Sequence, residues 1–204
     1  MKLKLLSYDN NTKLKGGNIP SFGLPAGETC LFRCAGCYAS KGKYRLDVVK
    51  EKRAENYAAS QKPDFINKLK EEIEYLKTKK GVKYVRIHDS GDFYSKEYID
   101  KIYQVFKDTP DVIGYAYTKR VLDKKLSKEL DKLRSLPNFI LINSIIDGKP
   151  NYYKDMKVLR EVQQKTGAFV CPANLTKEKI TCNNPCKICF SKSAEKKGVL
   201  FKAH

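Results

Sequence analysis

The chain has 204 residues, 41% of them hydrophobic, which is enough apolar material to bury the core of one ordinary domain. No stretch reaches the roughly 20 consecutive apolar residues that a membrane-spanning helix needs, and the sequence turns polar soon after its start, so we expect a cytoplasmic protein with no membrane segment. The formal net charge of +18 favours polyanions such as nucleic acid, although the excess lysines are dispersed along the chain.

Strand-like and helix-like segments alternate along most of the chain, with short connections between them. In chain order, we expect a strand at 19–24, helices at 46–60 and 65–76, a strand at 82–87, a helix at 98–106, a strand at 112–117, a helix at 122–133, a strand at 139–142, a helix at 159–162 and a strand at 168–170. This order predicts a parallel α/β sheet joined by right-handed crossovers. The alternation then stops, so we expect an α/β domain over 1–170 and a small cysteine-rich extension over 171–204.

Proline, serine and glycine mark the ends of the four later helices. Pro63 can open the first of these helices, and Ser95 can cap the second. Pro110 and Pro137 stop the second and third helices, and Gly167 ends the fourth.

Seven cysteines fall into two groups, and their arrangement indicates metal binding rather than disulfide bonding. The groups are Cys30, Cys34 and Cys37 near the start, and Cys171, Cys182, Cys186 and Cys189 near the end. Three thiolates leave one iron of a cubane cluster without a protein ligand, so the first group predicts a [4Fe-4S] cluster with one open position. The second group has a fourth cysteine and can close its own site around zinc or a second [4Fe-4S] cluster.

Two alternatives remain for these cysteines. The first group would hold a closed zinc site if His88 or an aspartate completed it. The open set would instead be Cys182, Cys186 and Cys189 if Cys171 were a reactive thiol without a metal.

Polar residues gather where the predicted strands end. In parallel α/β proteins, ligands bind beyond the carboxyl ends of the strands. The residues concerned are Cys30 after the first strand, His88, Asp89, Ser90, Gly91 and Asp92 after the second, Lys119 and Arg120 after the third, Asn143 and Ser144 after the fourth, and Cys171 after the fifth. We expect them to form one composite active site, with His88, Asp89 and Tyr117 as the catalytic candidates.

Each catalytic candidate also has a structural interpretation. His88 can be a buried, hydrogen-bonded histidine, and Asp89 or Asp92 can be a helix cap or a turn residue. Tyr117 lies within a predicted strand, so core packing is enough to explain it.

The segment CLFRCAGC at residues 30–37, with Tyr38 after it, resembles the C-x3-C-x2-C loop of the radical S-adenosylmethionine (SAM) superfamily. The resemblance implies a partial, open TIM-type βα barrel of parallel strands. It also implies that SAM binds the fourth iron, and that electron transfer from the reduced cluster cleaves SAM to methionine and a 5'-deoxyadenosyl radical. An electron donor such as flavodoxin or ferredoxin would then be a partner.

The same resemblance implies cofactor-binding roles for residues at the strand ends. Ser90, Gly91 and Asp92 stand where the superfamily has a Gly-Gly-Glu-like turn that holds the amine of SAM. The further implied roles are the SAM carboxylate for Lys119 or Arg120, the ribose hydroxyls for Asn143 or Ser144, and adenine stacking for Tyr38, since Gly36 replaces the aromatic residue usual before the third cysteine.

A narrower resemblance covers about residues 18–190. The segments LPAGETC, CYA, RIHDSGDF, YAYTKR and CPAN, followed by a cysteine-rich end, are similar to a family from phages and mobile elements called gene product 88. That family implies no established substrate.

These observations predict a radical SAM enzyme of unknown substrate, with nucleic acid favoured by the positive charge. The alternative is a non-catalytic zinc or iron–sulfur module that binds nucleic acid. Metal content separates the two, because two clusters need about seven to eight irons per chain, whereas a zinc module would hold no iron.

Overall fold

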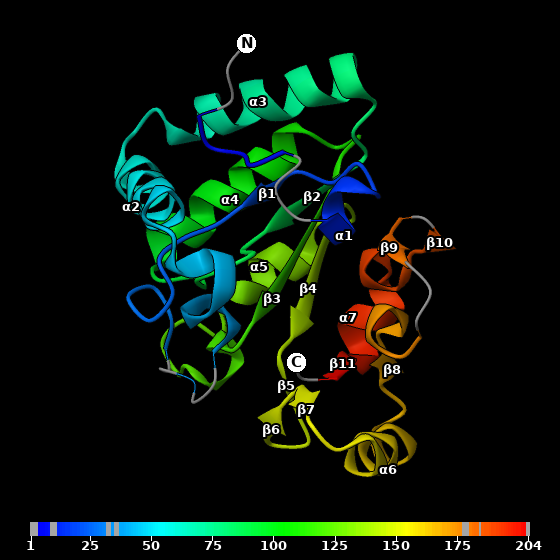
Figure 1. Cartoon of the computed structure of the whole chain (residues 1–204). Helices are drawn as coiled ribbons and strands as arrows, with labels where there is room; N and C mark the ends of the chain where they lie inside the picture. The colour runs from blue at the N-terminus through cyan, green and yellow to red at the C-terminus, as the bar shows by residue number, and fades with distance from the viewer. Residues whose placement is uncertain are drawn as a thin grey trace.

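The computed structural model describes residues 4–8, 12–31, 34, 37–176, 180–183 and 185–202, without the side chains of residues 12, 13 and 174. Its centre is a sheet of four parallel strands in the order β1-β2-β3-β4 (Figure 1). The strands are β1 (Ser21–Phe22), β2 (Tyr84–Ile87), β3 (Ile113–Thr118) and β4 (Phe139–Asn143). The expected α/β class and the parallel direction of these strands are confirmed.

The helices are α1 (Thr12–Lys15), α2 (Asp47–Gln61), α3 (Phe65–Lys80), α4 (Lys96–Asp108), α5 (Leu130–Ser135), α6 (Met156–Thr166) and α7 (Lys192–Lys197). Ser95 caps α4 by accepting a hydrogen bond from the backbone N–H of Tyr98, and Gly167 ends α6 with a φ of +67°. The helix expected at 122–133 is wrong in its first half, because Leu122 is exposed and the α-helix begins only at Leu130. No helix in the described part of the chain combines the length and apolarity needed to cross a membrane.

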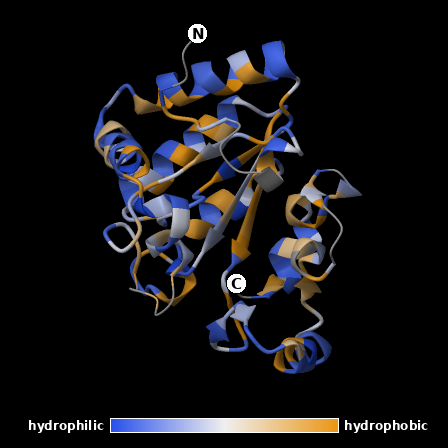
Figure 2. Ribbon diagram, viewed as in Figure 1, coloured by the Kyte–Doolittle hydropathy of each residue, from blue (hydrophilic) through white to orange (hydrophobic). Residues whose placement is uncertain are grey.

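Helices α3, α4 and α5 cover one face of the central sheet. Their apolar side chains form one buried cluster with Val85 and Ile87 of β2 and Leu141 of β4. In Figure 2, α3 and α4 turn their apolar side toward the sheet and their hydrophilic side toward solvent. The consecutive strand order places these connecting helices on the same face, and the described strands form an open sheet rather than a closed barrel.

The last part of the chain covers the opposite face of the sheet. The short 3-10 helix η5 (Ile188–Phe190) and α7 pack on β3 and β4, on the side away from α3 and α4 (Figure 1). Tyr115 and Ile140 share a buried cluster with Ala194, and the ring of Phe190 stacks on Tyr84 with centroids 4.0 Å apart. Residues predicted as a small extension therefore supply the second side of the core.

The fifth predicted strand exists but does not join the central sheet. The strands outside that sheet are β5 (Ile145–Ile146), β6 (Lys149–Pro150), β7 (Tyr152–Tyr153), β8 (Phe169–Val170), β9 (Thr181–Cys182), β10 (Pro185–Cys186) and β11 (Val199–Lys202). β8 pairs with β11, which also pairs with β7, and the β5–β6 hairpin intervenes between β4 and this second sheet. The expectation of five strands in one sheet is wrong, because Leu159, Ala168 and Leu200 form a small core of their own.

The segment at residues 4–8 is tied to α3. The carboxylate of Glu72 accepts hydrogen bonds from the backbone N–H groups of Leu5 and Leu6, at distances from 2.8 to 3.1 Å. Ser7 then forms an antiparallel bridge with Ser21, so this segment covers the outer edge of β1.

Candidate functional site

The turn after β2 is built around Asp89. The Asp89 carboxylate pairs with the guanidinium of Arg53 at 2.6 Å, and Arg53 also donates to the hydroxyl of Ser90 at 2.8 Å. The backbone oxygen of Asp89 accepts hydrogen bonds from the hydroxyls of Tyr38 at 2.6 Å and Tyr44 at 3.2 Å. These contacts fix the residues that follow Cys37 against the end of β2.

Asp92 joins the ends of three strands. Its carboxylate accepts from the Thr118 hydroxyl at 2.7 Å and from the backbone N–H of Lys119 at 2.9 Å, and its own N–H donates to the Thr29 hydroxyl. Burial raises the pKa of the Asp92 carboxyl, and these hydrogen bonds oppose that rise. Asp92 is 4% exposed, and its role at the amine of SAM stays a prediction.

Gly91 and Arg120 complete this junction. Gly91 has a φ of +78°, and a Cβ at this position would lie 2.6 Å from the Thr29 hydroxyl oxygen, so only glycine fits without displacing Thr29. Arg120 pairs with Asp123 at 2.8 Å and donates to the backbone oxygen of Thr29 at 2.9 Å. Arg120 is therefore already engaged by protein groups.

The structure separates the predicted catalytic residues. His88 is 2% exposed, lies against the helix layer and shares a 2.9 Å hydrogen bond with the Tyr98 hydroxyl. Burial, followed by the nearby Arg86 charge, lowers the pKa of His88 to about 3, so the imidazole is neutral at physiological pH. Tyr117 lies on the opposite face, where its hydroxyl is 2.9 Å from the Cys189 sulfur. His88 thus has the contacts expected of a buried, hydrogen-bonded structural histidine.

Asn143 and Ser144 lie at the end of β4. Asn143 accepts a hydrogen bond from Arg134 at 2.9 Å and borders an open hollow of about 290 Å³ that Arg134 also lines. Ser144 is buried, and its N–H donates to the backbone oxygen of Thr118 at 2.8 Å. The first of these two residues faces solvent and the second supports the sheet.

The three thiols of the first cysteine group are partly buried and close enough to influence one another. Burial raises the pKa of the Cys30 thiol, as do the nearby Asp92, Cys37 and Cys34. The pKa of Tyr152 is raised by burial and then by Cys34 and Cys37, which places β7 beside this group. The intervening residues 32–33 and 35–36, including Gly36, lie outside the described residues.

The second cysteine group lies against the sheet. Burial raises the pKa of the Cys189 thiol to about 12, and the neighbouring Cys182, Cys171 and Cys186 raise it further, against the lowering effect of the Tyr117 hydrogen bond. In the part of the chain that the structure describes, no three His, Cys, Asp or Glu side chains converge tightly enough to hold a single metal ion. Metal binding at both groups stays a prediction.

Arg86 was not identified from the sequence, yet its buried side chain lies near Tyr38, which follows Cys37, and near Tyr117, which contacts Cys189. Its guanidinium carbon is 5.8 Å from the centroid of the Tyr117 ring. Burial disfavours its charge, but Tyr38, Tyr115 and Asp89 together raise the pKa of Arg86. Its Nε is buried and has no hydrogen-bond partner within the residues described. A buried donor without a protein partner is open to a bound water or anion.

Arg53 was also missed, although the sequence carries a signal for it. The buried residues of α2 are Arg53, Asn56 and Ser60, which are polar but recur at helical spacing. The apolar residues of α2 recur irregularly because the buried face of this helix is polar. Buried polar side chains need hydrogen-bond partners, so this pattern was the available signal for the network around Arg53.

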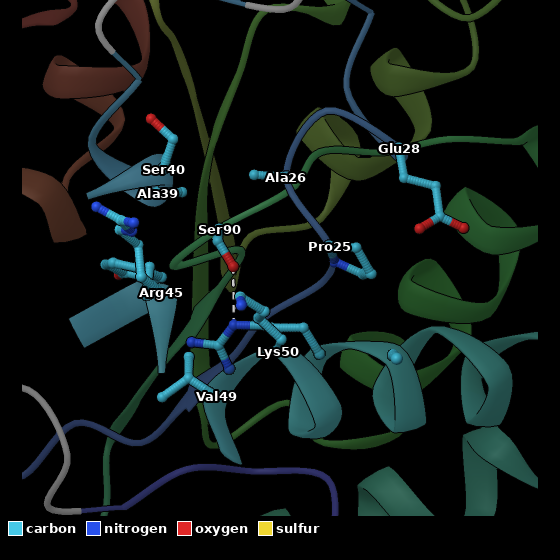
Figure 3. Close-up of a pocket in the computed structure, with 12 residues that line it drawn as sticks. Pro25, Ala26, Glu28, Ala39, Ser40, Arg45, Val49, Lys50 and Ser90 are labelled. Atoms are coloured by element: carbon cyan, nitrogen blue, oxygen red, sulfur yellow. Dashed lines mark hydrogen bonds between the residues drawn. The ribbon is translucent and has the colours of Figure 1, made fainter. Parts of the chain in front are cut away.

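A cavity of about 440 Å³ opens beside the residues that follow Cys37 (Figure 3). Its wall combines the loop after β1, the 3-10 segments η1 (Tyr38–Ser40) and η2 (Gly42–Arg45), and the start of α2. The polar and charged residues that line it are Glu28, Ser40, Tyr44, Arg45, Lys50, Arg53 and Ser90. A volume in this range suits a small organic ligand or one unit of a polymer.

Comparison with known proteins gives one family and one relative. The family model described as Gene product 88 matches residues 3–199. The "Gene 88 protein" of Mycobacterium phage L5 is 32% identical over 134 residues, which is 57% of this chain and 55% of that protein. The chain thus spans about half the length of this curated relative. No solved structure matches the chain.

Proposed function

The chain belongs to the gene product 88 family, and from that premise and its two cysteine groups we propose that it is a radical SAM enzyme. Cys30, Cys34 and Cys37 would hold the catalytic [4Fe-4S] cluster. The four later cysteines would hold a second cluster or zinc. The family description carries no activity, so the proposal depends on the arrangement of the site.

One observation carries the proposal: the buried Arg86, whose Nε has no partner in the described residues, lies near Tyr38, which follows Cys37, and near Tyr117, whose hydroxyl is 2.9 Å from the Cys189 sulfur. A single tetrahedral zinc would hold its thiolates about 3.8 Å from one another. A four-iron cage spreads its ligands further apart, so thiols that neighbour one another without converging on one point are compatible with it.

The fold is consistent with the same proposal. Consecutive parallel strands whose connecting helices share one face correspond to part of an opened TIM-type barrel. The other face of the sheet, which would be the inner side of such a barrel, carries Arg86, Tyr115 and Tyr117. We therefore assign the partial-barrel interpretation to the four-stranded sheet only.

A reduced cluster with SAM bound would supply one-electron cleavage of the sulfonium and a 5'-deoxyadenosyl radical. Arg86 would hold the SAM carboxylate, because its guanidinium forms no hydrogen bond or ion pair within the described residues. Arg120, whose Nε also has no partner among the described residues, is already held by Asp123 and by the backbone oxygen of Thr29. If Cys189 were a thiolate ligand, the Tyr117 hydroxyl 2.9 Å away would donate to it, and hydrogen bonds to ligand sulfurs tune the reduction potential of a cluster. An external one-electron donor such as flavodoxin or ferredoxin would complete the system.

The test begins with protein purified under argon and reconstituted with iron and sulfide. We expect about seven to eight irons per chain if both groups hold clusters, and 5'-deoxyadenosine after SAM and dithionite are added. Replacing Cys30, Cys34 and Cys37 with alanine should remove about four irons and all of the product. Wild-type protein that carries a full cluster and forms no 5'-deoxyadenosine would refute the proposal.

A second experiment addresses Arg86. Arg86→Gln should keep the iron content but raise the SAM concentration needed for half-maximal product formation, whereas Arg86→Lys should recover part of the loss. Equal SAM dependence in wild type and both variants would remove Arg86 from the proposal while leaving the cluster assignment in place.

The runner-up function is a non-catalytic metal module that binds nucleic acid. Its support is the net charge of +18. Two zinc ions with no iron, together with salt-dependent binding to nucleic acid, would favour this function over the enzyme.

A further inference from the structure

Residues 38–50 form an exposed surface beside the cavity, which we term the 38–50 surface. It carries four cations and one carboxylate, and it holds three of the five large apolar side chains exposed in the described part of the chain. The cations are Lys41, Lys43, Arg45 and Lys50, and the apolar residues are Tyr38, Leu46 and Val48. Positive charge and an exposed aromatic ring therefore occur together here.

The cations of this surface differ from many of the lysines elsewhere. Exposed or partly exposed lysines on the helices commonly pair with carboxylates, as Lys68 does with Asp64 and Lys165 with Asp147. Among the described residues, no carboxylate pairs with Lys41, Lys43 or Arg45. Lys50 pairs with Asp47, but both side chains are well exposed and such a pair contributes little. The surface thus keeps positive charge available for a partner.

The ring of Tyr38 is held ready for stacking. Its hydroxyl points inward and donates to the backbone oxygen of Asp89 at 2.6 Å, while the residue remains 56% exposed. Tyr44 contacts it edge-on with ring centroids 5.6 Å apart. Because both ends of the side chain are fixed, a base stacking on the exposed face would cost little conformational entropy.

The cavity continues this surface toward the loop after β1 and the turn after β2. Arg45 and Lys50 belong to both the surface and the cavity wall, and Ser90, in the turn after β2, lines the same cavity (Figure 3). Glu28 is the one carboxylate that lines the cavity, and Arg53 lies deeper, paired with Asp89. A linear polyanion bound along these cations would therefore reach the residues that follow β1 and β2.

We propose that the 38–50 surface binds single-stranded nucleic acid, with phosphates on Lys41, Lys43 and Arg45 and one base stacked on Tyr38, so that a nucleotide enters the cavity. The proposal rests on the proposed function, since it identifies the polymer as the substrate. A single strand is required because a duplex hides its base faces. A membrane is disfavoured because α2 buries a polar stripe and lacks the apolar face of a surface-binding helix.

The first test measures binding of a labelled single-stranded DNA, an RNA of the same sequence and the corresponding duplex by fluorescence anisotropy over a range of salt. The variant Lys41→Gln/Lys43→Gln/Arg45→Gln should lower the slope of log K against log salt by about 2, because three phosphate contacts are lost. The matched control Lys79→Gln/Lys80→Gln/Lys83→Gln removes the same charge from exposed positions at the other end of β2. Equal weakening by both triple variants would overturn the proposal.

The second test addresses stacking. Tyr38→Ala should weaken binding of the single strand between about fivefold and a hundredfold, whereas Tyr38→Phe keeps the ring and should retain most of the affinity. Circular dichroism of each variant checks that the fold is intact. Tyr38→Ala that is folded and binds as wild type does would overturn the stacking assignment.

The outcomes separate this inference from the proposed function. If nucleic acid binds in a salt-dependent way through the 38–50 surface but no 5'-deoxyadenosine forms, the radical SAM proposal is wrong and the nucleic-acid-binding inference is supported. If 5'-deoxyadenosine forms but the affinity for single-stranded nucleic acid does not depend on Lys41, Lys43 and Arg45, the radical SAM proposal is supported and the inference about the surface is wrong. Binding of phosphatidylserine vesicles that follows the same variants, without binding of the oligonucleotide, would replace nucleic acid with a membrane and overturn the inference.

Discussion

Replacing Arg53 with methionine should destabilise the protein by about 3 kcal/mol at neutral pH. Arg53 and Asp89 are bonded at 2.6 Å, with 10% and 7% of their side chains exposed. Methionine preserves much of the apolar stem but leaves the Asp89 carboxylate buried without its cation. Removing one partner of a buried pair typically costs about 3–5 kcal/mol, and the lower end applies here because 10% and 7% of the two side chains remain exposed.

The assay is equilibrium unfolding in urea under reducing conditions, followed by circular dichroism. With a slope near 2 kcal/mol per molar urea, the midpoint should fall by about 1.5 M. Lys50→Met is the matched control, because Lys50 on the same helix pairs with Asp47 at 2.9 Å, but the two side chains remain 61% and 87% exposed. That control should change the stability by less than about 0.5 kcal/mol.

If Arg53→Met and Lys50→Met shift the urea midpoint equally, burial of the Arg53–Asp89 pair does not contribute the expected stability. A small effect in both variants would mean that water reaches Asp89 in the folded state. The double variant Arg53→Met/Asp89→Asn should then be compared with the single variants, since a buried pair requires non-additive losses.

Three further predictions concern stability. Glu72→Gln should lower the free energy of unfolding by about 1.5–3 kcal/mol in the same urea assay. Hydrogen exchange should also become faster at the amides of Leu5 and Leu6, which donate to the Glu72 carboxylate. Unchanged exchange at both amides would show that these hydrogen bonds do not hold the segment. Asn138→Ala should cost about 2–3 kcal/mol by urea unfolding, because the Asn138 amide donates to three buried backbone carbonyls, and a neutral result would mean that water replaces it. The pKa of His88 is about 3 when folded, below its ordinary value of about 6.5, so the unfolded chain binds the extra proton and stability falls with decreasing pH by up to about 1.4 kcal/mol per unit between those values. His88→Gln should therefore lose less stability than wild type between pH 6 and pH 5, and identical pH dependence would show that His88 is not the group responsible.

The central elements were predictable because their signals are local. Mostly apolar runs identified the three longer strands, since a strand covered on both faces needs apolar residues at most positions; Arg86 in β2 is an exception. Ser95 and Gly167 marked helix ends through backbone geometry that depends on one or two residues. The partner of β8 was not predictable in this way, because a two-residue strand carries no information about the strand it will pair with.

The candidate site was predicted in outline but not in the direction of its side chains. Residues that follow β1, β2 and β3 do meet, as the contacts of Asp92 with Thr29 and Thr118 demonstrate. Alternation along β3 sends Tyr117 to the face covered by the tail. His88 turns the other way because its φ is +65°, and a non-glycine residue gives no sequence signal for that conformation. Shared position at a strand end therefore does not ensure a shared active site.

The ribosome makes η5, α7 and β11 after all four strands of the central sheet, because these elements follow the strands in the sequence. The helix layer can assemble on β1 to β4 as soon as about two-thirds of the chain has emerged, but Tyr115 and Ile140 remain open to water until the last turns follow. A nascent chain stalled before that point would present an apolar, strand-rich surface to chaperones. Any metal at Cys189 can be loaded only after the helix layer and β1 to β4 have been made, because that thiol follows all of them in the chain.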